Sequence, residues 1–248
     1  MEIESIYNAY LKELEKTKQR DKGVFHASSA GSCYRKQMYS YYDYPSDEKD
    51  DKSYRLLRLG TIVHSDVESA ISLYQNRFPE KDIYIEQKVR IRNLEVSGTF
   101  DAGEMIENRF GQSEFNLYDL KTAAAYKWTT KFGRKQNRVA DSDLNYKLQL
   151  GTYALGVKEH YNPDWIGMYL IWYNKNTSQM REQDVDPHYI GEALTYWEDV
   201  NEIKEDLGKA FETELEPMIT YGVPMQDWEC SYCQFESICP STLSKKKK

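Results

Sequence analysis

Residues 115–122 read FNLYDLKT, and residues 98–101 read GTFD shortly before them. The first stretch is typical of a half-buried β-strand, whose side chains alternate between two faces, so Asp119 and Lys121 point the same way. With Asp101 from the preceding strand, they form an oxygen-rich site that suits a hard divalent cation. The ammonium group of Lys121 can stabilise the charge that develops on a phosphate under attack by water. The pattern predicts metal-dependent phosphodiester cleavage; the alternative is an exposed Asp–Lys pair of little energetic consequence.

A helical stretch upstream can supply a further ligand. Residues 54–78 have helical periodicity, which places on one face Leu57, Thr61, His64, Glu68 and Ile71. On that face His64 and Glu68 are neighbours at i and i+4. An imidazole beside two carboxylates favours manganese or another transition metal as well as magnesium. Taken alone, such a residue is more often a buried histidine that has a hydrogen-bond partner and no metal.

A second helix, expected at residues 142–160, carries two further polar side chains. Gln149 and Tyr153 again stand at i and i+4, so they share one face of this helix. Taken alone, they are compatible with an amphipathic helix that makes one polar contact.

In this order, the four elements resemble the RecB-type branch of the PD-(D/E)XK nucleases. The family pattern is a helix with Gly-x3-His-x3-Glu, an Asp after a Gly, an acidic residue-x-Lys strand, and Gln-x3-Tyr on a helix. The chain matches it at Gly60, His64, Glu68, Gly98, Asp101, Asp119, Lys121, Gln149 and Tyr153. Asp119 stands where many members carry Glu. The resemblance covers about residues 28–240, which is nearly the whole chain.

The resemblance implies a role for each matched residue. It makes His64, Asp101 and Asp119 metal ligands, together with the carbonyl oxygen of Leu120. It makes Lys121 the catalytic lysine. The catalytic set is completed by Glu68, and by Gln149 and Tyr153, which support the site and the DNA backbone.

The four cysteines form a second motif. Cys230, Cys233 and Cys239 follow the pattern Cys-x2-Cys-x5-Cys, and Cys33 lies near the N-terminus. The chain shows no signal peptide, so a disulfide framework is not expected. Four thiolates can hold either zinc or a 4Fe–4S cluster. A structural zinc site more often uses two Cys-x2-Cys pairs, and Cys33 has no second cysteine beside it.

One N-terminal cysteine with a C-terminal trio is similar to the iron–sulfur subset of this family, which includes helicase–nuclease subunits and CRISPR-associated exonucleases. Residues 28–36, SSAGSCYRK, are similar to its entry motif, although a proline is common where Tyr34 stands. The resemblance implies a 4Fe–4S cluster on the four cysteines, with structural zinc as the alternative. A loop closed between Cys33 and Cys230 ties distant parts of the chain together, so we expect a structural rather than a redox role.

Length and composition indicate one catalytic domain. A chain of 248 residues can bury a sizeable core, and a hydrophobic content of 40% excludes wholesale disorder. There is no run of eighteen apolar residues that would cross a membrane, and no Gly-x4-Gly-Lys-Ser/Thr motif of a fused helicase motor. Cysteines used as metal ligands, without an export signal, predict a cytoplasmic location in a bacterial, archaeal or virus-infected cell.

The formal net charge of −7 argues mildly against a nucleic-acid partner, because affinity for DNA comes largely from neutralised phosphates. A local basic channel is nevertheless sufficient for an enzyme. Residues 127–138 hold five basic residues, two aromatic residues and no acidic one. They are predicted to bind DNA through Lys127, Trp128, Lys131, Arg134, Lys135 and Arg138. The alternative is an ordinary solvated surface.

The predicted fold is α/β, a restriction-endonuclease-like mixed central sheet flanked by helices, with a small C-terminal four-cysteine iron–sulfur lobe. Strands are expected at 83–91, 94–106, 115–122, 166–173 and 180–185, and helices at 2–18, 54–78, 142–160 and 188–216. Residues 1–248 form a single nuclease domain. Its parts are an N-terminal helical region at 1–50 that contributes Cys33, the iron–sulfur lobe at 217–240, and a flexible basic tail at 241–248.

The expected function is hydrolysis of DNA by an exonuclease that acts on single-stranded ends with manganese or magnesium. CRISPR adaptation, recombination and repair, and virus genome processing use such enzymes, so proteins of these pathways are expected partners beside DNA. One alternative is a nuclease-fold DNA-binding or assembly subunit with weak or no catalysis. Another is a zinc-stabilised interaction protein that has lost catalysis. The intact acidic pair and Lys121 count against the latter.

Overall fold

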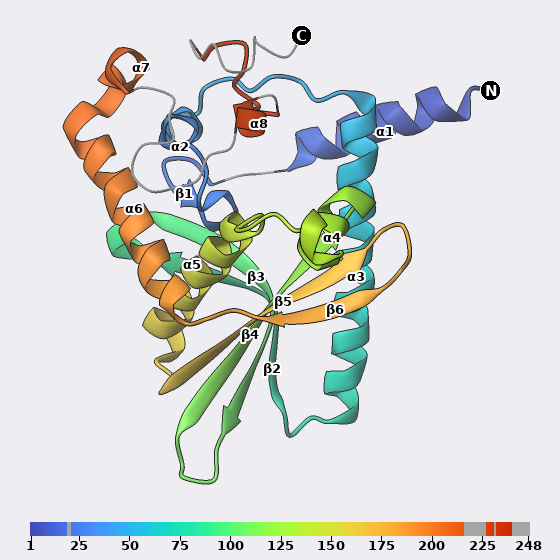
Figure 1. Cartoon of the computed structure of the whole chain (residues 1–248), viewed down its shortest axis with the longest axis vertical. Coiled ribbons are helices and arrows are strands. Elements are labelled where there is room, and N and C mark those ends of the chain that lie inside the picture. Colours follow the sequence, from blue (N-terminus) through green and yellow to red (C-terminus); the bar gives the residue numbers. More distant parts are fainter. Residues whose placement is uncertain (19–20, 216–226, 231, 240–248) are drawn as a thin grey trace.

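A mixed β-sheet forms the centre of the protein in a computed structural model, which describes residues 1–18, 21–215, 227–230 and 232–239 (Figure 1). In this part of the chain the sheet has six strands in the order β1-β3-β4-β5-β6, and β2 pairs with β3. The strands are β1 (Phe25–His26), β2 (Asp82–Ile91), β3 (Val96–Glu107), β4 (Ser113–Ala123), β5 (Trp165–Asn174) and β6 (Met180–Asp184). The β1/β3 and β4/β5 pairs are parallel, and the β2/β3, β3/β4 and β5/β6 pairs are antiparallel.

Helices flank this sheet and connect its strands. They are α1 (Ile3–Thr17), α2 (Tyr34–Tyr41), α3 (Asp51–Arg77), α4 (Ala125–Phe132), α5 (Leu144–Tyr161), α6 (His188–Leu207), α7 (Phe211–Glu214) and α8 (Asp227–Cys230). The long helix α3 begins after Asp50, whose side chain accepts a hydrogen bond from the backbone N–H of Ser53 at 2.7 Å. This contact satisfies a donor that the first helical turn leaves unpaired.

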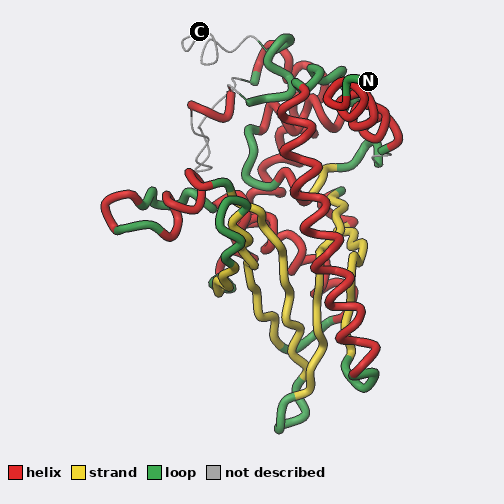
Figure 2. The backbone as a smooth tube through the Cα atoms, turned by 90° about the vertical axis from the view of Figure 1, so that its right-hand side faces the viewer, coloured by secondary structure: helices red, strands yellow, loops and turns green. Residues whose placement is uncertain are grey.

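The helices α3 and α5 cover opposite faces of the sheet. Adjacent strand residues face opposite ways, and on β4 Leu120 lines a small pocket with Val67 of α3, whereas Lys121 contacts Gln149 of α5. In Figure 1, α3 stands on one side of the sheet and α5 and α6 on the other, and Figure 2 shows α3 running along the strands. The strand β4 therefore offers one set of side chains to each helical layer.

The helix α5 is deeply buried because it lies between the sheet and α6. Two glycines permit this close approach. A Cβ atom on Gly151 would lie 2.2 Å from the carbonyl oxygen of Tyr189, and one on Gly156 would lie 2.7 Å from the Cβ of Val89. The core around α5 is close-packed, so even one added methyl group is costly here. The backbone of α5 is fixed by this packing, which gives its polar side chains defined positions.

The predicted α/β class, the central mixed sheet and its flanking helices are confirmed. The helix expected at 188–216 is interrupted, because α6 ends at Gly208, whose φ is +50°. Leu57 stands two turns before His64 on the continuous helix α3 and so shares its face, but Leu57 is 50% exposed. The N-terminal part of α3 packs against α1 rather than the sheet, through Asn8 with Asp51 and Arg55.

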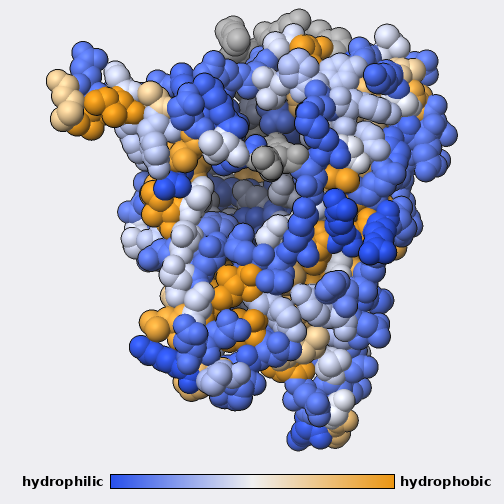
Figure 3. Space-filling view, turned by 180° about the vertical axis from the view of Figure 1, so that it is seen from behind, coloured by the Kyte–Doolittle hydropathy of each residue, from blue (hydrophilic) through white to orange (hydrophobic). Residues whose placement is uncertain are grey.

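The predicted amphipathic helix at 2–18 is confirmed as α1, but only Leu11 of it is buried. Apolar side chains gather where α1 begins, at the protruding end seen in Figure 3, and there Ile3 and Ile6 are more than half exposed. The predicted tail at 241–248 lies outside the described residues, as do residues 217–226, 231 and 240 of the expected iron–sulfur lobe. Within the described ranges, no helix combines the length and the apolar character required to span a membrane.

Candidate active site

The candidate site lies where β3 and β4 diverge. On the edge of β3 that faces β4, pairing with β1 ends at Ser97 and pairing with β4 begins at Ala102. Beyond Tyr118, the strand β4 continues with β5 alone as its partner. The four residues 98–101 therefore border a gap in the sheet. Such a gap leaves room for side chains and for a ligand between two strands.

Asp101 bridges this gap. Its Oδ2 atom accepts a hydrogen bond from the backbone N–H of Leu120 at 2.6 Å, and its Oδ1 atom lies 3.4 Å from Nδ1 of His64 on α3. Burial alone would lower the pKa of His64, but the hydrogen bond to Asp101 and the negative charges of Asp101 and Asp119 together raise it. The structure thus brings together the predicted residues from β3, β4 and α3.

Asp119 and Lys121 continue the site toward α5. The carboxylate of Asp119 is 2% exposed, and its Oδ2 atom lies 2.7 Å from Nζ of Lys121. Lys121 donates a hydrogen bond to Oε1 of Gln149 at 2.9 Å, and Nε2 of Gln149 donates to the hydroxyl of Tyr153 at 2.8 Å. The four residues form one chain of contacts. The pairing of Asp119 and Lys121 on one face, and of Gln149 and Tyr153 on another element, matches the spacing read from the sequence.

For both Asp119 and Lys121, burial opposes the effect that the partner's charge has on the pKa. Burial, with the carboxylate of Asp101, raises the pKa of Asp119 to about 6, against the lowering effect of Lys121. Burial would lower the pKa of Lys121, but Asp119 outweighs it, so this pKa lies above its usual value. At neutral pH the two groups therefore form an ion pair. Each charge depends on the other, because a lone charge is costly to bury.

The chemistry of these side chains fits a divalent cation. Carboxylate oxygens and an imidazole are suitable ligands for magnesium or manganese, and Oδ2 of Asp119 is a buried acceptor without a hydrogen bond of normal geometry. In the part of the chain that the structure describes, no three His, Cys, Asp or Glu side chains converge as metal ligands. The carboxylates face Lys121, His64 and the N–H of Leu120 instead. A cation would have to draw them away from these partners.

Two glycines of the motif have steric roles. A Cβ atom on Gly98 would lie 2.6 Å from the Cβ of Ala27 and 2.7 Å from Cε1 of Tyr153. Only a residue without a side chain therefore lets the Tyr153 ring lie on β3. A Cβ atom on Gly60 would lie 3.3 Å from Oγ1 of Thr122, so this glycine lets α3 approach β4.

Glu86 on β2 is a neighbour of the site that the sequence pattern did not reveal. The pairs Ile85–Ala102 and Gln87–Phe100 place it opposite Asp101, and its φ of +50° is unusual for a residue other than glycine. Burial and the carboxylates of Glu68 and Asp101 raise the pKa of Glu86 to about 7. In the sequence, Glu86 looked like an ordinary charged residue on the outer face of an alternating strand, and no local signal marks its backbone conformation.

Part of the predicted DNA-binding segment, residues 127–138, makes contacts within the protein itself. Trp128 is only 9% exposed and packs on Phe132, so the prediction that it stacks on bases is wrong. Lys131 lies 2.5 Å from the buried carboxylate of Asp143, and Lys127 donates a hydrogen bond to the carbonyl oxygen of Ser142. On α4, Lys131 stands four residues after Lys127 and three after Trp128, so the three side chains lie on its inward side. They anchor the segment to the start of α5.

The remaining basic residues of this segment face solvent. Arg134, Lys135 and Arg138 are exposed and follow α4 directly. Arg138 donates a hydrogen bond to the carbonyl oxygen of Gly133 at 2.9 Å, which leaves its positive charge without an acidic partner in that contact. These three residues remain candidates for contact with phosphates.

The four cysteines gather beside α2, although they come from both ends of the chain. Cys33 caps the start of α2, and burial, together with the nearby Cys233 and Cys239 thiols, raises its pKa to about 11. Burial also raises the pKa of Cys233, to which Cys239 and Cys230 contribute. None of the four forms a disulfide in the described part of the chain. Their thiols lie near enough to influence one another, although no three of them converge as metal ligands in the described part of the chain.

The segment around these cysteines is attached to the linker before α3. The backbone N–H of Asp47 donates to the carbonyl oxygen of Gln234 at 2.7 Å, and the N–H of Ser237 donates to the Asp47 carboxylate at 3.0 Å. Phe235 is buried against Tyr39 of α2, with 5.3 Å between ring centres. These contacts hold the C-terminal segment on the N-terminal region.

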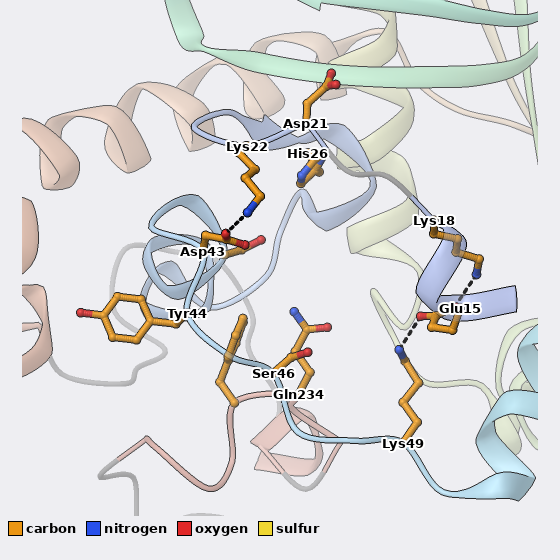
Figure 4. A pocket seen from close by; sticks show the side chains of 12 residues that line it. Glu15, Lys18, Asp21, Lys22, His26, Asp43, Tyr44, Ser46, Lys49 and Gln234 are labelled. Atoms are coloured by element: carbon orange, nitrogen blue, oxygen red, sulfur yellow. Dashed lines mark hydrogen bonds and ion pairs between the residues drawn. The ribbon is translucent and has the colours of Figure 1, made fainter. Parts of the chain in front are cut away.

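A second, polar pocket lies away from the site, between the end of α1, the linker and the cysteine segment (Figure 4). Its lysines already have partners, since Lys18 and Lys49 point at Glu15 and Lys22 points at Asp43. Positive and negative side chains thus offset each other along the pocket wall. This balance gives the pocket no marked preference for an anionic ligand.

Comparison with known proteins identifies the family. The sequence profile of the PD-(D/E)XK nuclease superfamily matches residues 66–240. The chain therefore belongs to this superfamily, whose members use divalent cations such as magnesium or manganese. No curated protein sequence matches the chain.

Solved structures share its fold. One is the structure described as "Crystal structure of SSO0001", with 18% identity, a TM-score of 0.55 and coverage of 97% of both chains. A "Putative exonuclease" from Eubacterium rectale has 15% identity and a TM-score of 0.46, with coverage of 84% of this chain and 92% of the other. The first similarity shows that the two proteins share a fold over nearly the whole of both chains.

Proposed function

We propose that the protein hydrolyses phosphodiester bonds of DNA with a divalent cation, as an exonuclease on single-stranded ends. The observation that carries this proposal is the meeting of Asp101, Asp119 and Lys121 at the gap between β3 and β4. Family membership makes hydrolysis of nucleic acid the expected chemistry. The hydrogen bond from Lys121 to Gln149, and the one from Gln149 to Tyr153, support the same assignment.

The residues have separate roles in this proposal. His64, Asp101, Asp119 and the carbonyl oxygen of Leu120 would hold the cation, and Glu68 adds negative charge beside them. When bound, the cation supplies Lewis-acid activation of a water molecule and of the phosphate. The ammonium of Lys121 offsets charge that develops on the phosphate oxygens. Gln149 fixes that ammonium by a hydrogen bond, and Tyr153 fixes Gln149.

The depth of the site favours a single strand as substrate. The side chains of His64, Asp101 and Lys121 are 29%, 18% and 14% exposed, and Asp119 is almost fully buried. A phosphate must therefore enter the gap in the sheet to reach them. A single strand can bend its backbone into such a recess, whereas the paired backbone of a duplex is stiffer. We infer that strand ends or unpaired segments are cleaved first.

End-labelled DNA tests the proposal directly. Single-stranded and double-stranded oligonucleotides of one sequence are incubated with the protein in magnesium, in manganese and in chelator. We expect cleavage only with a cation, faster on the single strand, and with short products released from an end. Circular single-stranded DNA separates exonuclease from endonuclease action. Cleavage that continues in chelator, or a duplex cleaved as fast as the single strand, would contradict the proposal.

We also propose that the four cysteines hold a 4Fe–4S cluster that fastens the C-terminal segment to α2. The support is their gathering from distant parts of the chain, with the mutual influence on their pKa values described above. The alternative is structural zinc. A 4Fe–4S cluster and a structural zinc ion each take four protein ligands. The four thiolates supply all of them, which suits a structural role. Iron and zinc contents of anaerobically purified protein distinguish the two.

A second candidate is a nuclease-fold subunit that binds DNA and assembles with other proteins but cleaves weakly. The observation in its favour is that the acidic side chains face Lys121 and His64 rather than one another. The sequence resemblance points to CRISPR adaptation or recombination as the setting of either activity, in the cytoplasm. DNA binding without cation-dependent cleavage in the labelled-DNA experiment would favour this candidate.

A further inference from the structure

Tyr146 occupies a special position beside the site. It lies on α5 one turn before Gln149, and its ring centre is 4.9 Å from Nζ of Lys121. The same ring centre is 5.1 Å from Nζ of Lys127, which follows on α4. Two ammonium groups thus share one aromatic ring. The edge of this ring meets Trp172 of β5, with 5.6 Å between ring centres and an interplanar angle of 67°.

The ring completes the surroundings of the Lys121 ammonium. This group has three N–H donors, and it contacts Asp119 on one side and Gln149 on another. An ammonium within about 6 Å of an aromatic ring centre is attracted to the ring face, more strongly when water is excluded. Lys121 is 14% exposed, so little water competes with the ring. Three neighbours therefore restrict a side chain that is otherwise flexible.

The ring is itself held firmly. Trp172, which it touches, is fully buried, and the indole N–H donates to Oε1 of Gln183 at 2.9 Å. Lys127, on the same ring, is tied to the carbonyl oxygen of Ser142. Tyr146 is thus connected to the core on one side and to the start of α5 on the other. Because the ring is held in place, the ammonium of Lys121 that lies over it is held in place as well.

We propose that Tyr146 is a positioning residue for Lys121, and that its aromatic face holds the ammonium against Asp119 in the orientation that the reaction requires. This inference rests on the proposed function, because it gives Lys121 its catalytic part. The ring, rather than the hydroxyl, carries the effect. The competing explanation is that Tyr146 only fills space next to Trp172.

Two substitutions separate these explanations. Tyr146→Phe keeps the ring and removes the hydroxyl, whereas Tyr146→Leu keeps an apolar side chain and removes the ring. A matched control is Tyr189→Leu. The Tyr189 ring on α6 lies 4.9 Å from Nζ of Lys147, a lysine of α5 that is not among the site residues. Tyr146→Leu loses the ring contacts with Lys121 and Lys127, and Tyr189→Leu loses the ring contact with Lys147. Thermal midpoints show whether the two lose comparable stability.

The first readout is turnover on single-stranded DNA. We expect Tyr146→Phe to stay within about twofold of the wild type, and Tyr146→Leu to lower kcat by about tenfold or more with KM nearly unchanged. Tyr189→Leu should leave kcat unchanged at a similar loss of thermal midpoint. Equal effects of the two leucine variants would overturn the proposal, and so would a Tyr146→Phe variant as impaired as Tyr146→Leu.

The second readout needs neither cation nor activity. Reductive methylation of the metal-free protein, followed by mass spectrometry, measures how fast the Lys121 amine reacts. Removal of the ring frees this amine, so Tyr146→Leu should speed its labelling at least about threefold, while Tyr146→Phe and Tyr189→Leu do not. An unchanged labelling rate in Tyr146→Leu would refute the inference. A wild type without nuclease activity would instead refute the proposed function and leave this test intact.

Discussion

Asp101 on β3 accepts a hydrogen bond from the backbone N–H of Leu120 on β4, at 2.6 Å, across the gap in which the two strands no longer pair. The carboxylate replaces a backbone partner that strand divergence removes, as a buried N–H requires. The same contact sets Asp101 beside Asp119 and leaves its other oxygen toward His64. The divergence of the strands and the assembly of the site are thus one structural feature.

Asp119→Asn tests the catalytic assignment. The amide keeps the size of the side chain and removes its charge, so cation-dependent cleavage should fall by at least about a hundredfold, a usual size for a single electrostatic contribution. Cleavage of end-labelled single-stranded DNA measures the effect, and Lys121→Ala should behave alike. Asp184→Asn, an exposed carboxylate on β6, serves as the control and should retain full activity. Retained cleavage in both site variants would remove Asp119 and Lys121 from the mechanism.

Gly98→Ala tests whether the motif glycine makes room for Tyr153. The added methyl group meets Ala27 and the Tyr153 ring at less than 3 Å, so the variant should lose about 1–3 kcal/mol of unfolding free energy. Displacement of Tyr153 should also lower turnover. Gly191→Ala on α6 is the matched control, because its methyl group meets nothing within 4 Å. The control should gain up to about 1 kcal/mol from helix propensity. Equal stability of the two variants would contradict the steric argument.

The sequence predicted the elements whose periodicity is regular and missed features that depend on contacts between elements. Alternation along residues 83–91 identified β2, and the strand-like pattern of residues 115–122 identified β4, which is largely buried on both faces. Residues 127–138 appeared available for DNA because they include no acidic residue, yet the fold packs Trp128 on Phe132 and pairs Lys131 with Asp143. The +50° φ of Glu86, which lies between two residues of β2 that pair with β3, has no signal in the residue type.

Cys33→Ser tests the cysteine cluster. Anaerobically purified wild-type protein should be brown and hold about four irons per chain, as expected for a 4Fe–4S cluster. Cys33→Ser removes one thiolate from the gathered set and should lose most of the iron. Metal analysis and visible absorption measure both. Ser237→Ala, next to the cysteines but without a thiol, should keep the iron. Colourless wild-type protein with one zinc per chain would overturn the iron–sulfur assignment and leave the nuclease assignment standing.

Glu15 predicts a pH dependence of stability. Burial alone would raise the pKa of Glu15, but hydrogen bonds from Lys18 and Lys49 lower it to about 2. A carboxylate with a lowered folded-state pKa stabilises the fold above its unfolded pKa, near 4.5, and loses this contribution as pH falls toward 2. Glu15→Gln should therefore lower the thermal midpoint at pH 7 and have little effect near pH 2. Midpoints that differ equally at both pH values would contradict the ion-pair explanation.

The exposed basic residues after α4 should bind DNA without taking part in the chemistry. Arg134, Lys135 and Arg138 face solvent, unlike Lys127 and Lys131, which are tied to the fold. Replacing the three with Ala should weaken binding of single-stranded DNA and reduce the logarithmic salt slope by about 0.7 per lost phosphate contact. Turnover at saturating DNA should change little, because these charges act alike on bound substrate and transition state. Fluorescence anisotropy across a salt series measures the slope.

A control for this triple variant must change the net charge by the same amount elsewhere. The triple replacement of Lys52, Lys158 and Lys209 with Ala does so, because all three are exposed and lie outside residues 127–138. A general effect of charge on association would weaken binding in both triple variants by similar amounts, since long-range attraction follows the net charge. A local DNA path predicts a reduced slope in the first variant alone. An unchanged slope there would show that residues 134–138 are only a solvated surface, and that the strand reaches Asp119 and Lys121 by another route.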